Sequence, residues 1–229
     1  MLSDRVVIVT GAAGGLGRGV VPEILRQGAR VWAVLAPSEE NPFRAAGIAA
    51  VPANLVERAG AESAAGTVME AEGRIDALIH LAGGFAGGRP AAETDDETWR
   101  HMLSLNLNTA VNIIRATLPH MLAARHGRIL AIGTRTAVEP VAGLSAYNAS
   151  KAALVALIRT LALEVKNAGV TANILLPSVI DTPANRASNP GADYSKWVKP
   201  ESIASLLAFL ASGAAADISG AVIPVYGRS

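Results

Sequence analysis

The sequence predicts an α/β fold, a single-domain doubly wound parallel β-sheet of about seven strands with helices on both faces. Two observations lead to this prediction. Short apolar runs alternate with longer helical patterns along all 229 residues. These runs are continuously apolar instead of alternating with polar residues, which is typical of strands buried on both faces. We find no internal repeat or linker, so we expect one domain over residues 1–229.

Six strands are indicated clearly and a seventh more weakly. The clear ones are 6–9, 31–35, 77–81, 127–132, 170–176 and 221–225, and the weak one is 48–52. A capping box at Thr94–Glu97 predicts the start of a long helix that continues past Ile113. Pro200 and Glu201 predict the start of another. Pro22 lies inside the first predicted helix, where we expect a kink.

Composition excludes several classes of protein. The formal net charge is +1 and we find no run of Lys or Arg, so we expect neither nucleic acid nor a membrane as partner. The chain has no cysteine, which excludes disulfides and thiolate chemistry. The four histidines, His80, His101, His120 and His126, show no metal-binding spacing, so we expect no metal. We find no pattern typical of a signal peptide or a membrane span, so we expect a soluble, cytoplasmic protein.

A glycine-rich loop follows the first predicted strand directly. Thr10 begins the run, and its glycines are Gly11, Gly14, Gly15 and Gly17. Between a strand and a helix, such a loop lets a diphosphate approach the backbone and the positive end of the helix dipole. This context indicates the dinucleotide-binding turn of a Rossmann fold. The second strand ends in Leu35 without the acid that grips a ribose hydroxyl. Nothing there repels or holds a 2′-phosphate, so NAD and NADP both remain open as cofactor.

Tyr147 and Lys151 form a candidate acid–base couple. They lie four residues apart in a strongly helical segment, which places the phenol and the ammonium on one face. A nearby cation favours the phenolate and brings the pKa of a tyrosine toward neutral pH. Thr134, at the end of a predicted strand, offers a hydroxyl to a substrate oxygen. Asn106 lies on an apolar helix face, where a buried amide needs a polar partner.

In this order these motifs resemble the short-chain dehydrogenase/reductase family. The resemblance extends over nearly the whole chain and includes His80–Gly83 and Pro177–Thr182. It implies that Tyr147 exchanges a proton with the substrate oxygen while Lys151 lowers the tyrosine pKa and holds the nicotinamide ribose. It further implies that Thr134 positions the carbonyl and that Asn106 anchors a proton-relay water.

The resemblance also implies a set of cofactor contacts. Ile180 and Thr182 would fix the carboxamide, and Asn54 would lie near the adenine. The complete expected cofactor set is Gly11, Gly14, Gly15, Leu16, Gly17, Asn54, Ala82, Gly83, Tyr147, Lys151, Pro177, Ile180 and Thr182. The chain departs from the family pattern at Thr134, which replaces Ser, at Leu81, which replaces Asn, and at Ser178, which replaces Gly. None of these changes removes the proton-transfer couple.

Two stretches are similar to one branch of that family, the quinonoid dihydropteridine reductases. They are 82–88 and the segment from Asp181 through Trp197, and the likeness implies a substrate lid over residues 183–200. For substrate contact we expect Thr134, Tyr147, Tyr194 and Trp197, with Phe85 and Trp99 as weaker candidates. Those reductases typically lack the Ser/Thr and Asn members of the site and carry the acid that is missing at Leu35.

We therefore expect an NAD(P)-dependent oxidoreductase acting on a small-molecule carbonyl/alcohol substrate. Two alternatives stay open: a pteridine-type reductase, and a catalytically silent dinucleotide-binding sensor on the same fold. Segment 152–163 carries small and apolar residues on more than one side. Together with the family resemblance, this favours a homodimer or homotetramer.

Overall fold

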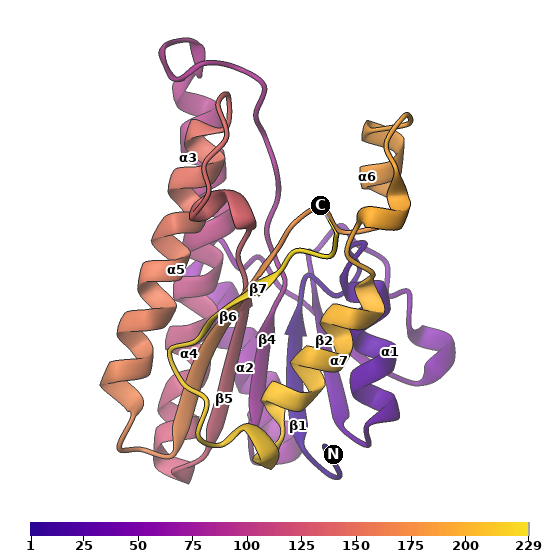
Figure 1. Ribbon diagram of the computed structural model, residues 1–229. Coiled ribbons are helices and arrows are strands. Elements are labelled where there is room, and N and C mark those ends of the chain that lie inside the picture. Colours follow the sequence, from indigo (N-terminus) through magenta and orange to yellow (C-terminus); the bar gives the residue numbers. More distant parts are fainter. Residues whose placement is uncertain (229) are drawn as a thin grey trace.

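In the computed structural model, which describes residues 1–228, seven parallel strands form one sheet (Figure 1). The strand order is β3-β2-β1-β4-β5-β6-β7. The strands are β1 (Val6–Thr10), β2 (Arg30–Leu35), β3 (Ala49–Pro52), β4 (Ala77–His80), β5 (Gly127–Ile132), β6 (Val170–Pro177) and β7 (Val222–Val225). The predicted fold class is confirmed, and the weakly indicated strand at 48–52 is the edge strand β3, paired with β2.

Helices cover both faces of this sheet (Figure 1). The α-helices are α1 (Gly17–Arg26), α2 (Arg58–Glu72), α3 (Asp96–Leu103), α4 (Thr109–Ala124), α5 (Ser145–Val165), α6 (Pro183–Ser188) and α7 (Pro200–Ala211). Because side chains alternate along a strand, Val6 and Ile8 of β1 pack in the core under α2, α4 and α5. Val7 and Val9 pack in the core under α1 and α7. All four are fully buried, which explains the continuous apolar runs.

The order of the strands reverses between β1 and β4. The chain builds outward from β1 through β2 to β3, and then crosses back to place β4 on the other side of β1. The loops after β1 and β4 therefore diverge and leave a crevice at the carboxyl edge of the sheet. The topology alone points to this edge as the place for a ligand.

The long helix predicted from Thr94 differs from the structure in two ways. Its N-cap is Asp95, whose carboxylate accepts a hydrogen bond from the Thr98 N–H at 2.7 Å, while the Thr94 hydroxyl donates to the Pro90 carbonyl. The helical run does continue past Ile113, but a π-helical turn over Ser104–Asn108 is inserted between α3 and α4. By contrast, α1 runs through Pro22 as a single helix.

In the part of the chain that the structure describes, we find neither a metal-binding cluster nor a membrane-spanning helix. Among residues 1–228, no group of His, Asp and Glu side chains is arranged to hold a metal ion. Within the same range, every helix is too short or too polar to cross a bilayer.

Candidate active site

A large cleft opens along the carboxyl edge of the sheet. Its volume is about 1270 Å³, and it is lined by the segments that follow β1, β2, β3, β4, β5 and β6, together with the start of α5. It lies over the crossover between β1 and β4, as the topology requires. The cleft brings together nearly every site residue that the sequence predicts.

The glycine loop after β1 forms the floor of the cleft. Gly11 has a φ of +63°, and a Cβ at this position would lie 2.7 Å from the Ala82 backbone nitrogen. A Cβ at Gly15 would lie 3.0 Å from the Thr182 side chain across the cleft, and one at Gly17 would collide with the backbone of the loop. No side chain caps the N-terminus of α1; the Arg18 N–H donates to the Gly14 carbonyl at 3.0 Å, which closes the loop onto the start of the helix. This backbone cradle fits the diphosphate of a dinucleotide.

An acidic side chain lies at the end of the cleft beside β2. The Glu39 carboxylate accepts a hydrogen bond from the Ala36 N–H at 2.8 Å, and the Glu39 N–H donates to the Ala36 carbonyl at 2.9 Å. This tight turn carries the carboxylate back to the strand end, where Glu39, Leu35 and Ala36 all line the cleft. The sequence interpretation overlooked this carboxylate at the end of β2.

Asn54 lines the same end of the cleft, after β3. Its side chain is turned toward its own loop, because the Oδ1 accepts from the Val56 N–H at 3.2 Å and the Nδ2 donates to Glu57 at 2.9 Å. The amide thus shapes the wall on which an adenine would rest.

Tyr147 lies in the first turns of α5, at the opposite end of the cleft. Its hydroxyl forms a hydrogen bond with the side chain of Thr134, which is buried at the end of β5. Burial raises the pKa of Tyr147 above its usual value, and the hydrogen bond with Thr134 lowers it by less. The sequence suggests that Lys151 lowers the pKa of Tyr147, but this contribution is not seen in the structure.

Lys151 lies one turn further along α5 and is buried. Its ammonium donates a hydrogen bond to the Ile132 carbonyl at 2.9 Å, and burial lowers its pKa to about 8. A Cβ at Gly83 would lie 3.1 Å from the Lys151 Nζ, so this glycine leaves the ammonium room at the cleft wall. Both Tyr147 and Lys151 face the cleft, as their spacing predicts.

Asn106 is fully buried in the π-helical turn and connects three parts of the site. Its Oδ1 accepts from the Gly84 N–H at 3.0 Å, and its Nδ2 donates to the Gly84 carbonyl at 3.1 Å. The same amide nitrogen donates to Ser150 at 3.1 Å, and Ser150 donates to the Tyr147 carbonyl at 2.7 Å. Sequence reasoning missed Ser150. Asn106 thus holds the loop after β4 against the helix that carries Tyr147.

His80 is the last residue of β4 and is buried, with 1% of its surface exposed. Its Nδ1 lies 2.9 Å from the Thr10 hydroxyl and its Nε2 lies 3.5 Å from the Thr109 hydroxyl. Because the Thr109 proton is already donated to the Leu105 carbonyl at 2.7 Å, Nε2 must carry the ring proton. Burial, followed by the Lys151 charge, lowers the pKa of His80 to about 3, so the ring is neutral and Nδ1 accepts from Thr10.

The segment 183–200 lines the cleft with residues other than those we expect. Among residues 1–228, the lining includes Ala184, Asn185, Ser188 and Asn189 but neither Tyr194 nor Trp197. The expected substrate contacts of these two aromatic residues are therefore not seen. The Tyr194 hydroxyl donates to the carbonyls of Arg186 and Asn189, and its ring packs on Trp197 at 4.8 Å. Their contacts stabilise the segment itself.

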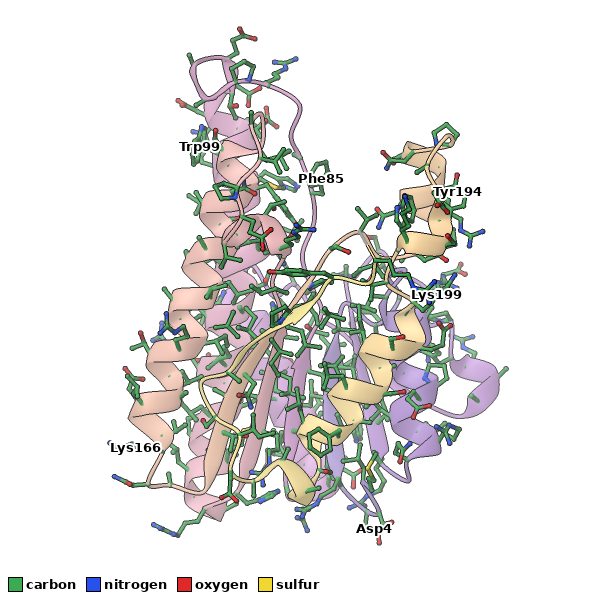
Figure 2. All side chains as sticks on the ribbon, viewed as in Figure 1. Asp4, Phe85, Trp99, Lys166, Tyr194 and Lys199 are labelled. Atoms are coloured by element: carbon green, nitrogen blue, oxygen red, sulfur yellow. The ribbon has the colours of Figure 1, made fainter. Side chains whose placement is uncertain are left out.

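One of the two weaker substrate candidates lines the cleft, and so do the expected cofactor positions after β6. Phe85 lines the cleft and Trp99 does not; Figure 2 shows Phe85 on the loop beside α5 and Tyr194 beside α6. Pro177, Ile180 and Thr182 all line the cleft. Asp181 fixes the base of the segment through ion pairs with Arg186 and Lys199, which hold the pKa of its carboxyl far below the usual range.

Comparison with known proteins decides the family. The short chain dehydrogenase family model matches residues 5–193. The chain belongs to the short-chain dehydrogenase family. A curated relative, 2,3-dihydroxy-2,3-dihydro-p-cumate dehydrogenase of Pseudomonas putida, is 33% identical over 100% of this chain and 95% of its own. The short-chain dehydrogenase/reductase olcF of Penicillium canescens is 32% identical over 98% of this chain and 96% of its own.

A solved structure shows the same fold in a member of this family. The 3-ketoacyl-(acyl-carrier-protein) reductase of Brucella melitensis, crystallised with NADH, superposes with a TM-score of 0.88. It is 28% identical, and the match covers 100% of both chains. The sheet order and the cleft described above are thus those of an oxidoreductase family.

Proposed function

We propose that this short-chain dehydrogenase is an NAD(P)-dependent oxidoreductase that transfers hydride between a nicotinamide cofactor and a small carbonyl/alcohol substrate. One observation carries the proposal. The Tyr147 hydroxyl lies in the cleft, hydrogen-bonded to Thr134, with the Lys151 ammonium one helical turn away. The glycine cradle at the floor of the same cleft supports a dinucleotide, and the NADH complex of the Brucella relative agrees with it.

A nicotinamide held in this cleft would supply the hydride that reduces the carbonyl carbon. Tyr147 donates its proton to the carbonyl oxygen, which becomes the hydroxyl of the product. Thr134 donates a hydrogen bond to the same oxygen and orients it toward the phenol. The Lys151 cation stabilises the phenolate that forms when the proton leaves. Oxidation of an alcohol uses the same groups in reverse order.

The structure supports a positioning role for Asn106. Its amide hydrogen bonds reach Gly84 on the loop after β4, the Met102 sulfur on α3 and Ser150 on α5. It therefore acts on Tyr147 through the placement of the loop and the helix. Whether it also anchors a relay water, as the family resemblance implies, remains a prediction.

The position of Glu39 supports a preference for NAD over NADP. A carboxylate at the end of β2 accepts hydrogen bonds from ribose hydroxyls and repels a 2′-phosphate. Among residues 1–228, the cations that line the cleft are Lys151 and Arg135, and both lie at the other end with Tyr147 or after β5. Neither of these two cations is placed to bind a 2′-phosphate beside Glu39.

The replacement Tyr147→Phe tests the proposal. We expect turnover to fall by about 10²- to 10⁴-fold, because the general acid is lost, while NADH binding measured by fluorescence stays within a few fold. The control is Thr67→Val, which removes an exposed hydroxyl on α2 outside the cleft and should leave turnover unchanged. Full turnover in the Tyr147 variant would refute the acid assignment.

The same assay separates the alternatives. A panel of ketones and a quinonoid dihydropterin, each with NADH and NADPH, distinguishes carbonyl reduction from pteridine reduction. Cofactor binding without turnover of any compound would favour the silent sensor. The homodimer or homotetramer stays a prediction, which sedimentation of the purified chain can measure; the side chain of Leu163, on α5, is 71% exposed in the single chain.

A further inference from the structure

One side of the cleft next to Tyr147 is an apolar wall, formed by Phe85, Val141 and Leu144. Phe85 is 66% exposed and Val141 is 56% exposed, although both lie inside a concave surface. Large apolar side chains left open in a cleft are typical of a surface that a ligand covers.

The wall is anchored to the catalytic helix. The Phe85 ring meets the Tyr147 ring edge-on, with 5.0 Å between centroids and 72° between planes. A Cβ at Gly87 would lie 3.4 Å from Phe85 and would collide with Leu144, so this glycine lets the two side chains approach. The Gly88 N–H donates to the Gly143 carbonyl at 2.8 Å, and this bond ties the Phe85 loop to the segment before α5.

The backbone beside Phe85 is held as well. Gly84 makes two hydrogen bonds with the buried Asn106 amide, at 3.0 and 3.1 Å. The Phe85 ring therefore occupies a defined position next to the reacting hydroxyl while one side of it stays open. Figure 2 shows this side chain on the loop that rises beside α5.

The charges near the wall are already paired. Arg135 forms an ion pair with Glu139 at 2.6 Å and lies over the Tyr226 ring at 4.8 Å. The segment across the cleft contributes the neutral side chains of Asn185, Ser188 and Asn189. A carboxylate or phosphate on a substrate would have to compete with Glu139 for Arg135, whereas an uncharged apolar group covers the wall without any such loss.

We propose that the substrate is an uncharged ketone, or the matching secondary alcohol, that carries an apolar ring seated on Phe85. The carbonyl then points to Tyr147 and Thr134, and the ring covers the apolar wall. Aromatic contacts of this kind favour a ring over an open chain, since the exposed Phe85 face and edge complement another ring. This inference rests on the proposed function, because it uses the same proton donor.

The test compares three ketones under identical conditions with NADH: acetophenone, butanone and 4-acetylbenzoate. We expect kcat/KM for acetophenone to exceed that for each of the other two by about tenfold or more. Phe85→Ala should lower kcat/KM for acetophenone by about tenfold and leave butanone within about twofold. The control is Leu25→Ala, which removes an exposed apolar side chain on α1 outside the cleft and should leave both ketones within about twofold.

The outcomes separate this inference from the proposed function. If the Phe85 variant lowers both neutral ketones equally, or if 4-acetylbenzoate is the best substrate, the ring site is refuted while the reductase remains. If no ketone is reduced, or if Tyr147→Phe retains full turnover, the proposed function itself fails and this inference fails with it.

Discussion

The neutral, buried His80 predicts an unusual dependence of stability on pH. Its pKa is about 3 in the folded protein, compared with an ordinary value of 6.5 in the unfolded chain. Below pH 6.5 the unfolded chain therefore binds more protons than the folded one, so stability falls as the pH drops from 6.5 to about 3. At about 1.4 kcal/mol per pH unit, the loss that this residue causes reaches about 5 kcal/mol.

His80→Leu removes the titration at the cost of hydrogen bonds. At pH 7 the Thr10 hydroxyl loses its acceptor, which lowers the unfolding free energy by about 1–3 kcal/mol. The Thr109 hydroxyl keeps its bond to Leu105, so no second donor is orphaned. Below pH 6.5 the wild type loses stability through His80, and the variant lacks this loss. The two curves of unfolding free energy against pH should therefore cross at about pH 5.

Urea unfolding followed by tryptophan fluorescence at several pH values between 4 and 7 measures both curves. The control is His101→Leu, which changes an exposed histidine of α3 and should leave the pH dependence as in the wild type. Carboxylates that titrate in this range act equally in all three proteins and cancel in the differences. Parallel curves for the wild type and His80→Leu would refute the reasoning.

Three further perturbations test other parts of the site. Burial lowers the pKa of Lys151 from 10.5 to about 8, so the folded state loses this proton before the unfolded state does. The free energy of unfolding relative to Lys151→Met should therefore rise by about 3 kcal/mol between pH 8 and 10.5. Urea midpoints that stay parallel over this range would contradict it. Glu39→Gln should strengthen NADPH binding by about tenfold in a fluorescence titration, and the neighbouring Glu40→Gln, outside the cleft, should not. Gly83→Ala places a Cβ 2.8 Å from the Asn106 Oδ1 and 3.1 Å from the Lys151 Nζ, and it should lower NADH affinity and turnover by about tenfold or more. Gly66→Ala, where a Cβ meets nothing within 4 Å, should leave both unchanged.

Features that depend on local spacing could be predicted from the sequence. The buried strands are apolar on both faces, so their runs are visible without any knowledge of what covers them. The four-residue step from Tyr147 to Lys151 places both side chains on one face of any helix, and the structure has both in the cleft. The glycine loop is equally local, because Gly11 needs its positive φ within the turn itself.

The tertiary structure decided the features that depend on loop conformation and on contacts between elements. The π-helical turn at Asn106 goes with hydrogen bonds to Gly84 and Ser150, which no helical period reveals. Glu39 enters the cleft because its own turn folds back onto Ala36. Tyr194 stays out of the cleft lining because its hydroxyl donates to the carbonyls of Arg186 and Asn189 and its ring packs on Trp197. A sequence pattern states which face of an element is apolar, but only packing determines what that face, or a loop side chain, meets.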